Sequence, residues 1–182
     1  MSFHPTTQRL ILRAPTMTDI GPVVRLIGEY DVAKNLQRVP HPYDETAFRE
    51  FLALNDQQRR DGTDFYFAIT RVMDGALIGM CSVHAEEGGL WRLGYWIGKP
   101  YWGQGYATEA ARPVMRFAFD DLGAERLTAG WFDDNPASGA VLHKVGFIVT
   151  GTTRVKSVAR GTEVLSNRVL LTREQYMRKK AA

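Results

Sequence analysis

Apolar positions in the first half of the chain follow a helical period in one segment and strand-like runs in several others. Phe48, Phe51 and Leu52 form an apolar face that predicts a helix over Asp44–Arg60. Strands are predicted at residues 9–13, 65–70, 76–84 and 90–97, and one or two short helices at residues 15–36. Short glycine-containing turns separate the last three strands, which therefore form an antiparallel meander.

The second half alternates helices and strands. Gly123 ends a predicted helix over residues 106–122, in which Pro113 is expected to produce a kink or loosen the first turns. Asn135 is the predicted N-cap of the next helix, and Gly146 ends it. Strands are predicted at residues 126–132, 147–152 and 163–171. A strand–helix–strand order requires parallel neighbours, so the pattern predicts an α/β domain with a mixed sheet.

Length and composition favour one globular domain over residues 1–182. The chain has 182 residues, of which 45% are hydrophobic and 24% charged. No membrane-spanning run and no signal peptide is visible, so no membrane partner is expected. One cysteine, Cys81, is expected to be a buried small hydrophobe and fits a cytoplasmic location. No metal is expected, and the chain is predicted to be a monomer or a homodimer.

Charge is unevenly distributed along the chain. Residues 135–182 contain nine Lys or Arg and two Asp or Glu, a net +7, whereas residues 1–134 have a net −4. One interpretation is a solvated basic tail that ends in Arg178-Lys179-Lys180. The other is a basic face that attracts an anionic ligand. Nucleic acid is not the expected ligand, because no recognised binding motif accompanies the charge.

The segment from Ile97 to Thr108 contains the strongest chemical signal. A strand ends there, a glycine-bearing loop follows, and a helix begins, so free N–H groups and the helix dipole point into the loop. Such a turn binds phosphate groups. It is neither a P-loop, which needs a glycine at Leu93, nor a dinucleotide fingerprint, which needs one at Thr108. An ordinary tight turn is the structural alternative.

The run Gly94-Tyr95-Trp96-Ile97 and the following Tyr101–Ala110 resemble the acetyl-CoA site of the GNAT acetyltransferase superfamily, in particular the branch of ribosomal-protein N-terminal acetyltransferases. Segments of the same branch recur in order at residues 9–13, 76–79, 135–138 and 144–147. The resemblance implies a single domain with a mixed, mostly antiparallel sheet. About seven strands, splayed between the fourth and fifth, would be flanked by about four helices.

The resemblance also implies a binding site for the cosubstrate acetyl-CoA. Gly105 and Ala107 match the last two fixed positions of the superfamily motif, whereas Trp102 stands where Gln or Arg is usual. Backbone N–H groups from Gln104 to Thr108 would hold the pyrophosphate, and the end of the preceding strand would pair with the pantetheine arm. The expected cosubstrate-binding residues are Trp96, Ile97, Trp102, Gly103, Gln104, Gly105, Tyr106, Ala107, Thr108 and Asn135.

The catalytic acid and base depart from the superfamily pattern. Leu142 occupies the position of the usual Tyr acid, and Ser138 matches the Ser proposed as its substitute in the ribosomal-protein branch. A helix residue bonded to local backbone is the structural alternative for Ser138. Arg92 stands where the branch often carries a Glu. The base is left open among Glu86, Glu87 and His84.

A site without a strong base favours an amine of low pKa. Deprotonating an α-amino group, whose pKa is near 7.7–8, costs roughly 1 kcal/mol at pH 7, against about 4.6 kcal/mol for a lysine side chain. The predicted function is direct acetyl transfer from acetyl-CoA to a primary amine, either a protein N-terminus or a small molecule. Two alternatives are a non-catalytic acyl-CoA-binding module and an enzyme that uses a longer acyl-CoA. The acceptor would be chosen by residues 19–60 and by the hairpin near residues 155–163.

Overall fold

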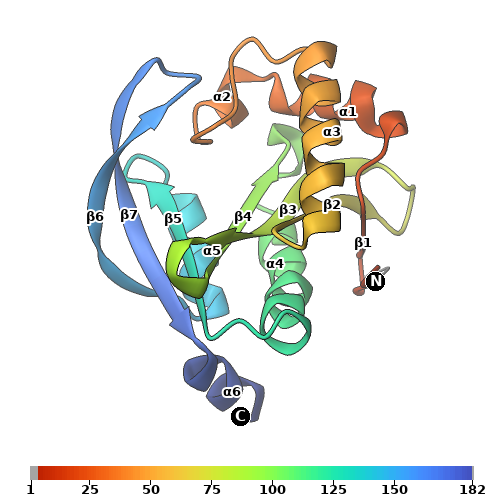
Figure 1. Cartoon of the computed structure of the whole chain (residues 1–182). Helices are drawn as coiled ribbons and strands as arrows, with labels where there is room; N and C mark the ends of the chain where they lie inside the picture. Colours follow the sequence, from red (N-terminus) through yellow and green to blue (C-terminus); the bar gives the residue numbers. More distant parts are fainter. Residues whose placement is uncertain (1–3, 182) are drawn as a thin grey trace.

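A computed structural model describes residues 4–181, which form one seven-stranded mixed sheet (Figure 1). The strand order across the sheet is β1-β2-β3-β4-β5-β7-β6. The strands are β1 (Leu10–Arg13), β2 (Asp64–Arg71), β3 (Leu77–Glu86), β4 (Leu90–Ile97), β5 (Arg126–Phe132), β6 (Ile148–Ser157) and β7 (Thr162–Thr172). The α-helices are α1 (Ile20–Ile27), α2 (Tyr30–Ala33), α3 (Glu45–Asp61), α4 (Tyr106–Arg116), α5 (Pro136–Val145) and α6 (Arg173–Ala181).

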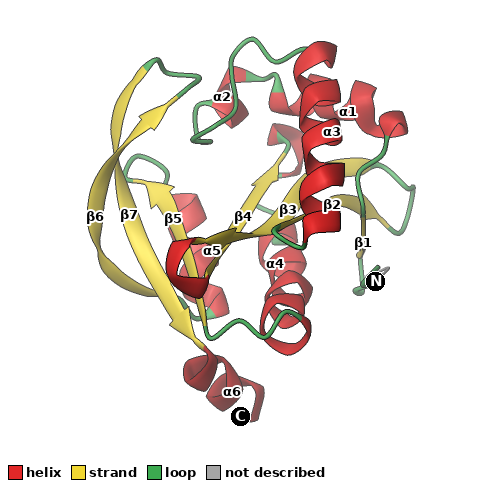
Figure 2. Ribbon diagram, in the orientation of Figure 1, coloured by secondary structure: helices red, strands yellow, loops and turns green. Residues whose placement is uncertain are grey.

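Helices cover both faces of the sheet (Figure 2). Phe67 and Ala68 are neighbours on β2, but they belong to two different buried clusters, because successive strand side chains point to opposite faces. The cluster around Ala68 contains apolar residues of α1 and α3, and the cluster around Phe67 contains those of α4 and α5. The predicted α/β architecture is confirmed.

The predicted splay of the sheet is also confirmed. Strands β1 to β4 pair antiparallel in sequence order. Strands β4 and β5 are parallel and pair only at Trp91 with Leu127 and at Arg92 with Thr128. Strand β5 pairs with β7 along its whole length on the other side. Beyond Arg92 and Thr128, β4 and β5 are no longer paired, so the sheet opens into a gap between them.

The helix predicted over residues 106–122 differs from the expectation in its second half. Helix α4 begins after Gly105, whose φ of 80° suits glycine, and it continues through Pro113. The departure from α-helical geometry comes later than expected, in a π-helix over Phe117–Asp121. Pro113 cannot donate a backbone hydrogen bond, but it lies on the buried side of α4, where packing holds the helix together.

The C-terminal region contains the largest corrections. Strand β6 extends to Ser157, well beyond the predicted end at residue 152. The basic end is part of α6, which the sequence did not predict, so the described residues form more α-helices than the expected number. Tyr176 of α6 stacks on Phe119 with ring centroids 4.5 Å apart, and Lys180 binds Asp120 at 2.9 Å. No helix in the described part of the chain is long and apolar enough to cross a membrane.

Candidate functional site

The turn before α4 presents backbone N–H groups that have no acceptor. Trp102 Nε1 donates to Ile97 O at 2.6 Å, and Gln104 Nε2 donates to Pro100 O at 3.2 Å, so both side chains hold the loop against its own backbone. Within residues 4–181, no acceptor is found for the backbone N–H groups of residues 103–108. These donors lie at the positive end of the α4 dipole, which is the usual arrangement for binding phosphate.

Arg9 fixes this turn from the N-terminal side of the chain. Its guanidinium lies 4.5 Å from the centre of the Tyr106 ring and donates to Gln104 O at 3.0 Å. It also forms an ion pair with Glu109, at 2.6 Å, in the first turn of α4. The expected strand at residues 9–13 gave no sign of this role. Because the Gln104 carbonyl oxygen accepts from Arg9, it does not accept from the free N–H groups of the turn. These N–H groups stay available to a phosphate.

The gap between β4 and β5 continues from this turn. The Gly98 N–H, just past β4, donates to Ile78 O on the β3 side. Backbone groups of successive strand residues point to opposite sides, so the N–H groups of Leu93, Tyr95 and Ile97 face the gap. These groups offer a free strand edge to an extended ligand.

A cavity of about 500 Å³ lies where the gap meets the early helices. Side chains from α1, α3, β3, β4 and β5, together with the loop over residues 35–40, form its wall. Of the predicted site residues, Trp96, Ser138 and His84 line this cavity, and Ser138 enters it from the N-terminal turn of α5. Tyr95, which the sequence gave no role of its own, also lines it.

Tyr95 and Ser138 form a hydroxyl pair at this cavity. The Tyr95 hydroxyl oxygen lies 2.9 Å from Ser138 O and 2.9 Å from Ser138 Oγ. Burial raises the pKa of Tyr95 above its usual value. If the Tyr95 proton goes to Ser138 Oγ, the Ser138 hydroxyl proton is free to point into the cavity. If it goes to Ser138 O, the Ser138 hydroxyl is the donor of the pair. The proton-donor role proposed below for Ser138 therefore uses the first arrangement.

Helix α5 is held close to β5 at this point. A Cβ on Gly139 would lie 2.7 Å from the Trp131 indole, closer than side chains tolerate. Asn135 is the N-cap as predicted, and its side chain accepts from the Ser138 N–H at 3.3 Å. Leu142 is buried in the core, so no Tyr hydroxyl enters the cavity from that position.

The three candidate bases lie in different places. His84 lines the cavity, and its Nδ1 is buried without a hydrogen bond, 3.8 Å from Asp64. Burial, followed by the charges of Arg38 and Arg92, lowers the pKa of His84 to about 4, so it is neutral at pH 7. Glu86 accepts from Thr128 Oγ1 at 2.6 Å and lines a second cavity, whereas Glu87 lines neither.

Cys81 has a structural position. Cys81 is buried in the core, and burial raises the pKa of its thiol to about 12, so it is not a nucleophile at neutral pH. Tyr101 is half-buried against the core, whereas Trp102 is 44% exposed. No group of His, Cys, Asp or Glu in residues 4–181 has the arrangement of a metal site.

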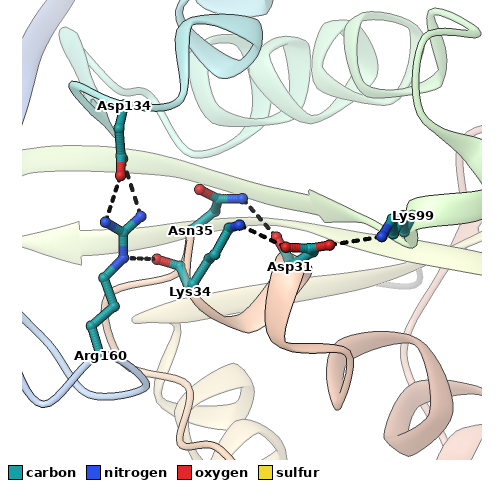
Figure 3. A network of polar contacts seen from close by, with 6 residues as sticks. All are labelled: Asp31, Lys34, Asn35, Lys99, Asp134 and Arg160. Carbon is teal, nitrogen blue, oxygen red and sulfur yellow. Dashed lines mark hydrogen bonds and ion pairs between the residues drawn. The ribbon is translucent and has the colours of Figure 1, made fainter.

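A polar network joins the β6–β7 hairpin to the segment after α2, whose Asn35 lines the cavity (Figure 3). Arg160 of the hairpin donates to Asp134 at 2.6 Å and to Lys34 O at 2.7 Å. At the other end of the network, Asp31 forms ion pairs with Lys34 at 2.6 Å and with Lys99 at 2.7 Å. The network therefore ties the loop after α2 to the end of β5 and to the loop after β4.

Comparison with known proteins agrees with this geometry. A family model described as an acetyltransferase (GNAT) domain matches residues 9–148. The chain belongs to the GNAT acetyltransferase family. N-acetyltransferase p20 of Bacillus licheniformis, itself uncharacterized, is 26% identical to this GNAT protein over 157 residues, which cover 85% of this chain and 88% of p20.

Solved structures of other proteins share the fold over almost the whole chain. The ribosomal-protein-S5-alanine acetyltransferase of Vibrio fischeri aligns with a TM-score of 0.83 and 16% identity, covering 96% of this chain and 98% of that one. RimJ of Mycobacterium smegmatis, in complex with CoA-disulfide, aligns with a TM-score of 0.79 and 20% identity, covering 91% and 82%. The family model confirms the expected superfamily, and a ribosomal-protein acetyltransferase is among the structural neighbours of this chain.

Proposed function

We propose that this GNAT protein transfers an acetyl group from acetyl-CoA directly to a primary amine, a protein N-terminus or a small molecule. One observation carries the proposal: acceptor-free N–H groups at the start of α4 lead along the free edge of β4 to the Tyr95–Ser138 pair. A phosphate site, a strand edge and a hydroxyl pair lie in the order in which a pyrophosphate, a pantetheine arm and a thioester follow one another in acetyl-CoA. The buried Cys81 thiol fits the expected cytoplasmic location.

The residues present fit the cosubstrate. Backbone N–H groups from Gln104 to Thr108 would hold the pyrophosphate, and Gly105 leaves open space above them, with Arg9 as the nearest atom that a Cβ would meet, at 3.5 Å. The N–H groups of Leu93, Tyr95 and Ile97 would pair with the pantetheine amides, and one of them would donate to the thioester oxygen. Acetyl-CoA supplies an acetyl group that is already activated, so the protein need not form a covalent intermediate.

Ser138 is proposed to donate to the leaving sulfur. Its hydroxyl is held at the cavity wall by the Tyr95 hydroxyl and by the N-terminal turn of α5. Tyr95 acts as a positioning residue, because it fixes the direction of the Ser138 hydroxyl. Trp96 and Asn135 are proposed to contact the cosubstrate, Trp96 from the cavity wall and Asn135 from the helix cap.

The side chains on the acceptor side provide no strong base. Glu86 is bound by Thr128 and by Arg92, and the lowered pKa of His84 makes it a weak proton acceptor. An amine that loses its proton at low cost near pH 7 suits such a site, which favours an α-amino group, with a pKa of about 7.7–8, over a lysine side chain. Water beside His84 or Glu86 would carry the proton away.

The cosubstrate site is tested by thermal unfolding with acetyl-CoA. Ligand at a hundred times its dissociation constant adds about 2.7 kcal/mol of stability to the folded state. Gly105→Ala should abolish most of this shift, because a Cβ would stand where phosphate oxygens approach the backbone. Gly75→Ala is the matched control, since Gly75 has a φ of 69°, has nothing within 4 Å and lies in the β2–β3 turn. If acetyl-CoA raised the melting temperature of both variants equally, the phosphate groups would not bind at Gly105.

A further inference from the structure

A second cavity, of about 550 Å³, lies on the face of the sheet that carries α1 and α3. Residues of β4, β5, β7 and β6 form its floor, and Gln37 and Arg38 form one wall. Helices α1 and α3 pack on β3 and β2, so they leave this end of the sheet uncovered (Figure 2). We call this cavity the outer groove.

The charge of the outer groove is strongly positive. Among the described residues, four arginines and one carboxylate line it: Arg38, Arg92, Arg126, Arg168 and Glu86. Arg92 and Thr128 already bind that carboxylate, at 3.3 and 2.6 Å. No ion pair joins a carboxylate in residues 4–181 to any of the other three arginines. Asp64 acts on the charge of Arg38 from beyond ion-pair distance, which leaves Arg126 and Arg168 without a nearby opposite charge among the described residues.

The arginines are spread along the groove. Arg168 pairs across the sheet with Gly130, and Arg126 lies four residues before Gly130 on β5. At about 3.3 Å per residue, this separation is roughly 13 Å. This is the separation of the backbone positions of the two arginines along the groove, and an extended peptide of about four residues spans it.

The outer groove adjoins the cavity that Ser138 lines. Gln37, Arg38, Arg92, Ala129 and Ser166 line both cavities. The Arg92 guanidinium lies over Gly130 at this junction: a Cβ on Gly130 would lie 2.8 Å from Asn167 O and 3.3 Å from Arg92. A peptide in the groove would reach the hydroxyl pair by passing the Arg92 side chain, which is also the residue that both cavities share on β4.

We infer that the outer groove binds a peptide whose free α-amine enters the Ser138 cavity and whose following residues are acidic. The inference rests on the proposed function, which supplies the reaction at the amine. Carboxylates along the peptide would pair with Arg38, Arg126 and Arg168. Charges at the rim of a binding site act mainly by attracting the oppositely charged partner. No aromatic side chain among the described residues lines the groove, which disfavours the base stacking that single-stranded nucleic acid uses.

Two peptides with the same N-terminal serine test the inference, one continuing with glutamates and the other with glutamines. The acidic peptide should have a kcat/KM about tenfold higher at low ionic strength. The preference should shrink in 1 M salt, where the Debye length falls to about 3 Å. In the double variant Arg126→Gln/Arg168→Gln, the kcat/KM of the acidic peptide should fall to within about threefold of that of the neutral peptide. The kcat/KM of the neutral peptide should not change.

Arg154→Gln/Lys156→Gln is the matched control. Both residues are exposed on β6, but they alternate with Thr153 and Val155, which line the groove, so they point to the other face. This variant loses the same charge and should keep the preference. Equal kcat/KM for both peptides, or equal losses in the two double variants, would overturn the inference.

Calorimetric titration of the acidic peptide in the presence of CoA separates this inference from the proposed function. Arginine-dependent binding without turnover would refute the transfer reaction and support the groove assignment. Turnover of free glutamate as efficient as that of the acidic peptide would overturn the peptide assignment. Tighter binding of an RNA oligonucleotide than of the acidic peptide would also overturn it.

Discussion

Removing the Ser138 hydroxyl tests the proton donor, and removing the Tyr95 hydroxyl tests how that donor is positioned. The two oxygens lie 2.9 Å apart, and the Tyr95 hydroxyl also reaches Ser138 O at 2.9 Å. Ser138→Ala should lower kcat on the order of a hundredfold, the usual contribution of a positioned proton donor. Acetyl-CoA affinity should change little, because the contact matters mainly as the C–S bond breaks.

Tyr95→Phe should lower kcat less, by roughly tenfold, since Ser138 keeps its hydroxyl but loses its fixed direction. The lost buried hydrogen bond should cost about 1 kcal/mol of unfolding free energy. If Tyr95 acts through Ser138, the double variant should be no slower than Ser138→Ala, because contacting residues that act as one unit are not additive.

Steady-state kinetics on a peptide α-amine, beside calorimetric titration of acetyl-CoA, measure these effects. A Ser138→Ala enzyme within about threefold of wild type would remove Ser138 from the mechanism. Multiplicative losses in the double variant would show that Tyr95 acts independently of Ser138. A loss of stability with unchanged kcat would assign both hydroxyls to the fold alone.

Two further predictions concern His84 and Arg160. Since the folded pKa of His84, about 4, lies below its usual 6.5, the unfolded chain protonates first on acidification. The protein should therefore lose up to about 3 kcal/mol of stability between pH 6.5 and 4, and urea unfolding across this range should show a shallower loss in His84→Gln. Arg160 joins the loop after α2 to Asp134, and Arg160→Gln removes this link. The KM for the amine should therefore rise severalfold, whereas the affinity for acetyl-CoA should not change. An unchanged KM for the amine would show that the loop does not take part in acceptor binding.

The parts of the fold that the sequence predicted depend on local signals. Asn135, Pro136 and Gly146 bound α5 where capping rules place them. Helix α3 likewise follows from its apolar spacing and from the αL residue Gly62 that ends it. Each of these residues acts on backbone within a few positions, so one sequence contains the whole signal.

The missed parts depend on contacts between distant segments. Helix α6 has a largely charged sequence, and its docking relies on the stacking of Tyr176 on Phe119, 57 positions earlier. The Tyr95–Ser138 pair joins residues 43 positions apart. Arg9 binds Glu109 across 100 positions. No local pattern marks such partners, because the sheet topology brings them together.

Acetyl transfer to a peptide α-amine, followed by mass spectrometry with CoA thiol release in parallel, tests the central claim most directly. A peptide with a free N-terminus and no lysine should gain one acetyl group for each thiol released. The same peptide with a blocked N-terminus and one lysine should react far more slowly, because its amine costs about 4.6 kcal/mol to deprotonate at pH 7. Acetyl-CoA binding without acetylation of either peptide would contradict the account and identify a binding module instead.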